Sequence, residues 1–155
     1  MSHDSGLEAI LAAIRSIVTE RIPFHTVLGL TVESLDGERV ALRLPMRDEL
    51  IGNFVRGVLH GGVISATLDV TGGLIALVSV LKDVQDQSPQ QIAGRFARMG
   101  TIDLRIDYLR PGSGTYFIAT GYVLRTGKRV AVTRMELHND APALIAVGTG
   151  AYSIS

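Results

Sequence analysis

The first twenty residues alternate apolar and polar positions with the period of a helix. The apolar side chains are spaced three or four residues apart, at Leu7, Ile10, Leu11, Ile14 and Val18. This spacing predicts an amphipathic helix over 7–19, which lies in an N-terminal segment 1–22. Pro23 is predicted to end the helix. The segment lacks a basic start followed by an apolar block, so we expect no signal peptide.

The residues that follow have the two-residue period of strands. Residues 27–35 (VLGLTVESL) and 39–46 (RVALRLPM) flank Asp36-Gly37, a pair that favours a tight turn. Together they predict a β-hairpin. Residues 47–61 contain several glycines and no clear period, and we predict a long loop there.

Residues 62–81 (GVISATLDVTGGLIALVSVL) are the most apolar stretch and predict a long helix, in which Asp69 is the one charged residue. Its length would suit a transmembrane helix. However, Asp69 would then lie near the membrane centre, no Arg/Lys cluster flanks the stretch, and no second span follows. We therefore expect no membrane span, but a helix covered by protein on most sides. Residues 82–100 are polar and are predicted to form an irregular connection.

The rest of the chain contains four strand candidates separated by short turns, namely 101–109, 115–125, 129–138 and 143–154. In the first, alternation predicts that Ile102, Leu104, Ile106 and Tyr108 share one face and Asp103, Arg105 and Asp107 the other. The element order is thus a helix, two strands, a buried helix and four strands. This order predicts an α+β fold, with an antiparallel sheet packed on a helix, in one domain over 1–155.

Composition narrows the function classes. Of the 155 residues, 46% are hydrophobic and only 19% are charged, which suggests apolar surface hidden in an oligomer. The net charge of zero argues against nucleic-acid binding. The absence of Cys excludes disulfides, zinc-thiolate sites and cysteine nucleophiles, and it suits a cytoplasmic location.

The positive charge is concentrated late in the chain. Residues 91–155 carry 8 basic and 4 acidic side chains, whereas residues 1–50 carry 5 and 8. This surplus would suit an anionic ligand, or it is simply a solvated strand face. The candidate ligand-binding cations are Arg95, Arg98, Arg110, Lys128 and Arg129.

Two features could carry chemistry. His60-Gly61-Gly62 precedes the apolar helix, where free N–H groups and the helix dipole suit a developing oxyanion; the alternative is a tight turn. Asp69 lies about two turns, or roughly 11 Å, into the helix. A buried carboxylate is either functional or paired, here with a cation of the basic C-terminal half. A functional Asp69 would be a general base or a nucleophile.

Two more residues are candidates for the site. Asn53 is a water or carbonyl ligand or a turn residue, and His60 is an acid, a base or a cap. The sequence contains no GxGxxG, Walker loop, HExxH or nucleophile elbow. We expect neither a metal nor a cofactor.

Three stretches together, LHGGVISATLDVTGG, GTIDLRIDYLRPGSG and GKRVAVTRMELHNDAPALIAVGTGAYSI, resemble the hotdog-fold acyl-CoA thioesterases of the PaaI-like superfamily. The similarity is greatest to the bacterial medium/long-chain (YigI-like) subgroup and runs from about residue 23 to the end. The resemblance implies a curved antiparallel sheet wrapped around one long helix. It also implies an active site between two subunits, in a dimer at least and most simply a dimer of dimers.

The resemblance also implies roles for individual residues. Asp69 matches the catalytic acid on the central helix, and Gly61 matches the glycine whose N–H polarises the thioester carbonyl. Asn53 matches the polar residue ahead of HGG, His60 supports the loop, and Gly62 contacts the substrate. The implied reaction is hydrolysis of acyl-CoA to a fatty acid and CoA, as part of fatty acid metabolism. Two alternatives remain open: a non-catalytic acyl-CoA-binding or regulatory domain, and a hotdog hydratase or dehydratase.

Overall fold

The computed structural model describes residues 3–82 and 87–155. In the first helix, side chains are described from residue 6 onward. The elements in chain order are α1 His3–Ser16, the π-helical turn η1 Ile17–Arg21, α2 Pro23–Leu28, β1 Thr31–Leu35, β2 Arg39–Pro45, the 3₁₀ turn η2 Asp48–Leu50, β3 Ile51–Asn53, β4 Val58–Leu59, α3 Gly61–Leu81, α4 Pro89–Arg98, β5 Gly100–Tyr108, β6 Tyr116–Thr126, β7 Val130–Asn139 and β8 Leu144–Ser153.

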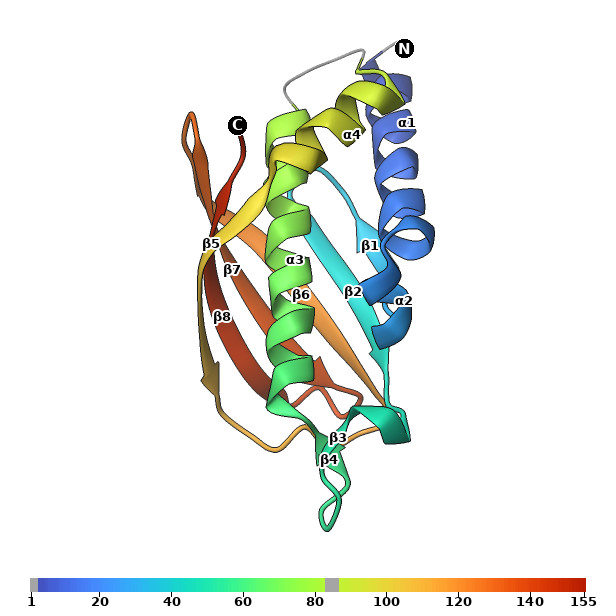
Figure 1. The fold of residues 1–155 in the computed structure, drawn as a ribbon, viewed down its shortest axis with the longest axis vertical. Helices are drawn as coiled ribbons and strands as arrows, with labels where there is room; N and C mark the ends of the chain where they lie inside the picture. The colour runs from blue at the N-terminus through green and yellow to red at the C-terminus, as the bar shows by residue number, and fades with distance from the viewer. Residues whose placement is uncertain (1–2, 83–86) are drawn as a thin grey trace.

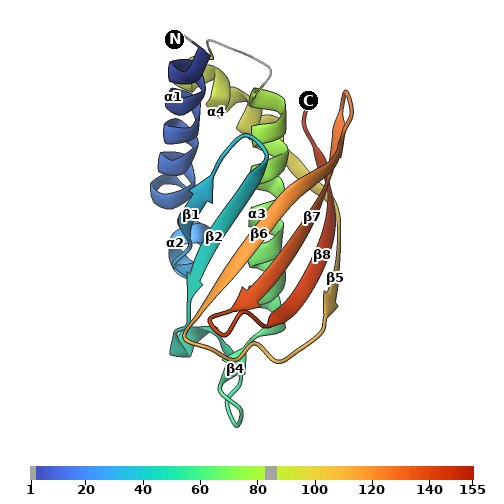
Figure 2. The same cartoon turned by 180° about the vertical axis from the view of Figure 1, so that it is seen from behind.

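Six strands form one antiparallel sheet in the order β1-β2-β6-β7-β8-β5. The sheet curves around α3, which lies across its inner face (Figure 1). Seen from behind, the strands lie in front of α3 and cross it (Figure 2). This is the hotdog architecture that the resemblance implied, and the predicted α+β fold is confirmed.

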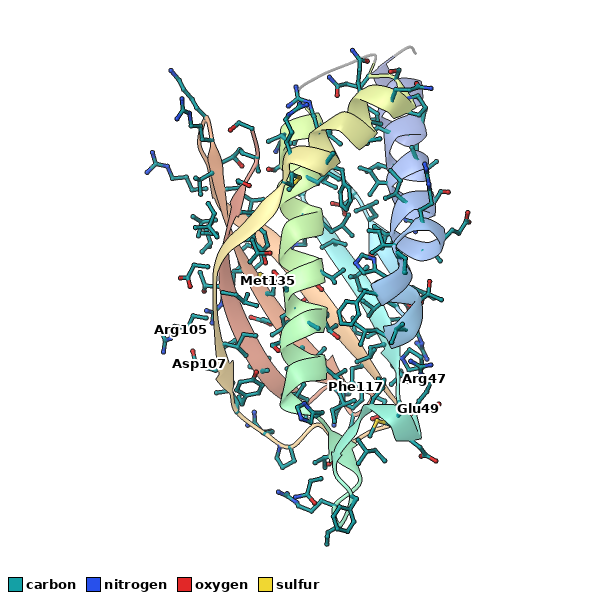
Figure 3. All side chains as sticks on the ribbon, viewed as in Figure 1. Arg47, Glu49, Arg105, Asp107, Phe117 and Met135 are labelled. Atoms are coloured by element: carbon teal, nitrogen blue, oxygen red, sulfur yellow. The ribbon has the colours of Figure 1, made fainter. Side chains whose placement is uncertain are left out.

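The core lies between α3 and the sheet. Leu68 and Ile75 of α3, and Phe117 and Met135 of the strands, have no solvent-exposed surface. Figure 3 shows Phe117 and Met135 between the sheet and α3. Helix α3 is long and apolar enough to cross a membrane, but 61% of its most apolar 18-residue stretch is buried inside the protein. It is therefore the core helix, as predicted.

The N-terminal segment packs beside α3 rather than under the sheet (Figure 1). The predicted helix is present and continues to Arg21 through the π-helical turn. The prediction of a strand over 27–35 is wrong at its start. Pro23 opens α2, and Gly29, with φ of 74°, ends it in the left-handed conformation that glycine adopts readily. The strand itself begins at Thr31 and pairs with β2 as the predicted hairpin.

Two segments predicted to be irregular contain regular structure. The predicted loop over 47–61 holds the short hairpin β3–β4, which projects from one end of the molecule (Figure 1). In the predicted connection over 82–100, residues 83–86 lie outside the described residues, but α4 follows them. Ser88 and Gln91 cap α4 reciprocally and Pro89 occupies its first turn, a pattern that is visible in the sequence.

The four C-terminal strands match the four predicted ones. The predicted alternation of the first is wrong at its start, because the register between β5 and β8 shifts between Thr101 and Asp103. Such a bulge adds one residue to one strand and reverses the facing of the residues before it. Ile102 is consequently 59% exposed, while Leu104 and Ile106 pack against the core.

Candidate active site around Asp69

The first turn of α3 presents one free backbone donor. The side chain of His60 caps the helix, its Nδ1 accepting a hydrogen bond from the Gly62 N–H at 2.8 Å. The N–H groups of Val63 and Ile64 donate to the His60 carbonyl. The Gly61 N–H has no acceptor among residues 3–82 and 87–155, so it is available to an oxygen at the positive end of the helix dipole.

The capping role settles which His60 nitrogen is bonded. Because Nδ1 accepts, the proton of the neutral ring lies on Nε2. The same hydrogen bond occupies the Gly62 N–H. Unlike the Gly61 N–H, it is therefore not free to bind a substrate oxygen.

The β3–β4 hairpin sets the position of this helix start. The His60 N–H donates to the Leu50 carbonyl at 2.8 Å. Gly52 lies so close that a Cβ there would approach the His60 Cα to 2.6 Å, and the hairpin therefore requires glycine at this position. Asn53 holds the turn itself, its Oδ1 accepting from the N–H groups of Val55 and Arg56, both at 3.2 Å.

Asp69 is half-buried on α3, and among the described residues its carboxylate has one hydrogen-bond donor, the hydroxyl of Thr101, at 2.9 Å. The ion pairs within the described residues join Arg105 to Asp107 and His138 to Glu136, and neither includes Asp69. The first of them lies on the outer side of β5 (Figure 3). The alternative that a cation of the C-terminal half neutralises Asp69 is therefore wrong for the described chain.

The bulge in β5 brings Thr101 to Asp69. Thr101 pairs with Tyr152 of β8, and paired residues on neighbouring strands point to the same face. Tyr152 faces α3, so Thr101 does too, although regular alternation would have turned it outward. The sequence does not single out Thr101 or Tyr152, because nothing in this stretch marks a bulge.

Tyr152 occupies a slot between two glycines. Its hydroxyl donates to the backbone carbonyl of Asp69 at 3.2 Å, and burial, reinforced by the nearby Asp69 carboxylate, raises the pKa of this phenol well above its usual range. A Cβ at Gly150 would lie 2.6 Å from the ring, and one at Gly72 would overlap the hydroxyl. Both glycines thus let the tyrosine reach α3.

A cavity of about 400 Å³, here called the Asp69 pocket, opens beside the carboxylate. Its walls come from α1, η1, α2 and α3, from the end of α4 and the start of β5, and from Tyr152 of β8. His25 also lines it; this buried ring contacts the Val18 carbonyl through Nδ1 at 3.0 Å. Burial lowers the pKa of His25, against the opposing effect of that hydrogen bond.

The five candidate cations are dispersed. Arg95 and Arg98 lie on α4, next to residues that line the Asp69 pocket, and Arg95 donates to Gln87 at 3.2 Å. Arg110 donates to the Leu144 carbonyl at 2.8 Å. Lys128 and Arg129 line a surface depression of about 500 Å³ at the β6–β7 turn. No group of three metal-ligating side chains occurs in the described part of the chain.

Within one chain, the free donor and the carboxylate are well separated. Gly61 and Asp69 lie on the same helix, and eight residues correspond to roughly 12 Å along its axis. Groups that act on one carbonyl must each come within about 3 Å of the reacting atoms. A single chain therefore cannot present both to one thioester.

Comparison with known proteins identifies the family. The profile of the Thioesterase superfamily matches residues 56–146. The chain is 40% identical over 154 residues to the medium/long-chain acyl-CoA thioesterase YigI of Escherichia coli (strain K12), with 99% of each chain covered. A crystal structure from Shewanella oneidensis, described as related to the thioesterase superfamily, superposes with a TM-score of 0.90, 42% identity and coverage of 96% of this chain and 97% of that one. One from Syntrophus aciditrophicus gives a TM-score of 0.84 at the same identity and coverage. This chain is therefore a member of the thioesterase superfamily.

Proposed function

We propose that the protein hydrolyses medium- and long-chain acyl-CoA thioesters to fatty acids and CoA, as the name of its relative YigI states for that protein. The observation that carries the proposal is the Asp69 carboxylate, which faces an apolar pocket without a cationic partner among the described residues. A carboxylate placed in this way is free to react with a substrate that enters the pocket.

In the proposed reaction, the Gly61 N–H donates to the thioester oxygen and stabilises the negative charge that develops on it. Asp69 of a second subunit acts on the carbonyl carbon by one of two routes. As a general base it takes a proton from water, and the hydroxide adds to the carbon. As a nucleophile it forms an anhydride, which water then cleaves. In both routes the C–S bond breaks and CoA leaves as a thiolate that solvent protonates.

The neighbouring residues support these two groups. The Thr101 hydroxyl holds the Asp69 carboxylate in one orientation, and His60 holds the helix start through its hydrogen bond to Gly62. Asn53 is retained as a candidate for orienting water, because the turn uses its Oδ1 and leaves its amide N–H groups to donate.

The separation of Gly61 from Asp69 supports a homodimer at least, with each site completed by two chains, and we retain a dimer of dimers as the arrangement. CoA phosphates would contact cations among Arg95, Arg98, Arg110, Lys128 and Arg129. Exposed phosphate contacts are screened by salt, so KM for acyl-CoA should rise with ionic strength. It should rise more than KM for an acyl thioester without the nucleotide; an equal response would exclude these contacts. A cytoplasmic, PaaI-like enzyme of fatty acid metabolism fits this function.

The test is release of free thiol from acyl-CoAs of graded chain length. A thioesterase releases CoA and is expected to prefer medium and long chains. A hydratase would leave the thioester intact and change the enoyl absorbance instead. A non-catalytic binding domain would bind acyl-CoA and release nothing, and either of these two results would refute the proposal.

A further inference from the structure

We infer that the Asp69 pocket holds the acyl chain of the substrate and that Gly73, on its α3 wall, controls the chain length accepted. This inference rests on the proposed thioesterase function and adds to it the place where the hydrocarbon lies. It assigns a role to the N-terminal helices and α4, which the reaction itself does not use.

The polar groups of the pocket already have partners. The Asp69 carboxylate accepts from Thr101, Tyr152 donates to the backbone of α3, and His25 contacts the Val18 carbonyl. The remaining lining is apolar or glycine, and no Lys or Arg of the described chain lines the pocket. A cavity of this size with an apolar lining suits a hydrocarbon chain, whereas the charged CoA moiety would find no counter-charge there.

The pocket extends in one direction from the carboxylate. Asp69, Gly73 and Leu77 are spaced four residues apart, so they lie on one face of α3, and the pocket follows that face for roughly 12 Å. Ile14 and Val18, also four apart, form the opposite wall. A thioester carbonyl held at Asp69 would therefore direct its acyl chain along α3 toward Leu77, between the core helix and the N-terminal helices.

Gly73 leaves the space next to the carboxylate open. It is half-buried, and a Cβ built there would lie 3.5 Å from the Tyr152 ring, an ordinary contact distance. Alanine therefore fits at this position without a clash, and a larger side chain would extend into the space where the chain would pass. Gly73 has no φ in the left-handed range, so a side chain is compatible with its backbone.

The size of the effect follows from the burial of methylenes. Each buried methylene contributes about 0.8 kcal/mol, which corresponds to about fourfold in kcat/KM. For the wild-type protein, kcat/KM should thus rise about fourfold with each added methylene until the acyl chain fills the pocket, and then level off. Gly73→Ala removes room for about one methylene. Gly73→Leu removes room for about four, which corresponds to a loss of roughly 200-fold in kcat/KM for a long chain.

The experiment measures kcat/KM for dodecanoyl-CoA and butanoyl-CoA with each variant and compares their ratio. We expect the ratio to fall about fourfold in Gly73→Ala and roughly 200-fold in Gly73→Leu. Gly94→Ala and Gly94→Leu are the matched controls, since Gly94 lies on α4 outside the pocket and a Cβ there meets only Arg98, at 3.9 Å. Thermal melting verifies that each variant is folded.

The outcomes separate this inference from the proposed function. If the wild-type protein releases no CoA from any substrate, the proposed function fails. If it releases CoA but Gly73→Ala, which fits the site, leaves the ratio unchanged, the acyl chain lies elsewhere and the thioesterase proposal stands. Equal losses on both substrates, or the same change of ratio in the Gly94 controls, would also overturn the role of Gly73.

Discussion

Replacing Asp69 by Asn removes the proposed catalytic charge and almost nothing else. The amide has the shape of the carboxylate, and its oxygen can still accept the hydrogen bond that Thr101 donates at 2.9 Å. Because Asp69 has no ion-pair partner in the described chain, the substitution leaves no unpaired cation behind. The variant should therefore change stability little and catalysis strongly.

The expected stability change is small. A hydrogen bond to a charged group contributes about 1.5–3 kcal/mol and a neutral one about 0.5–1.5. Desolvation of the half-buried charge, which costs stability in the wild-type protein, offsets part of that difference. We expect the free energy of unfolding to change by no more than about 1 kcal/mol, or roughly 2–4 °C in Tm. Loss of a buried ion pair would instead cost about 3–5 kcal/mol.

The expected catalytic change is large. Loss of a general base lowers the rate by roughly 10²-fold or more, which corresponds to about 2.7 kcal/mol of barrier. Loss of a nucleophile should cost more than that. Thiol release and a thermal melt on the same sample measure both quantities, with Glu33→Gln on the exposed face of β1 as the control. An Asp69→Asn protein that is destabilised by several kcal/mol but retains normal turnover per folded molecule would refute the catalytic role.

Three further substitutions test other parts of the site. Gly61→Ala should lower kcat/KM at least tenfold with Tm unchanged or raised, because the added methyl makes an ordinary contact with the Tyr108 ring, at 3.5 Å, but would crowd a thioester that approaches the Gly61 N–H; wild-type activity would contradict that close approach. Gly72→Ala should lower stability by about 1–3 kcal/mol, seen as a lower Tm, because its methyl would overlap the Tyr152 hydroxyl; an unchanged Tm would contradict that packing. The pKa of buried His25 lies below the usual 6.5, so the unfolded chain takes up a proton first as pH falls. The free energy of unfolding should therefore fall below pH 6.5, by at most about 1.4 kcal/mol per pH unit, and denaturant titrations of His25→Asn should lack this component.

Much of the fold followed from periodicity and turn residues. The long apolar stretch predicted α3, and four apolar runs between Gly- and Pro-containing turns predicted β5 to β8. The wrong secondary-structure predictions lie where helix-starting and helix-ending residues compete with the hydrophobic pattern. Residues 27–30 look like the start of a strand, but Pro23 and Gly29 enclose a short helix there. Polar residues hid α4, although Ser88 and Gln91 form its capping box.

Only the site residues that differ from the sequence around them could be predicted. Asp69 is conspicuous because it is the one charge in an apolar helix, and Gly61 because it follows a residue able to cap that helix. Thr101 and Tyr152 gave no such indication. Their positions depend on the pairing of β5 with β8 and on a bulge at Ile102, and register between strands remote in sequence is not encoded in either strand alone.

The apolar character of α3 has a structural cause that also explains its lone carboxylate. A helix with one face on a sheet and the other in water shows a polar stripe at helical spacing. One side of α3 packs on the strands, and α1, η1 and α4 border a pocket along another side, where Gly73 and Leu77 continue the line of Asp69. Each side therefore requires apolar or small residues. A carboxylate on the pocket side costs desolvation energy and has no cationic partner in the described chain, so its presence there supports the catalytic role that we propose for Asp69.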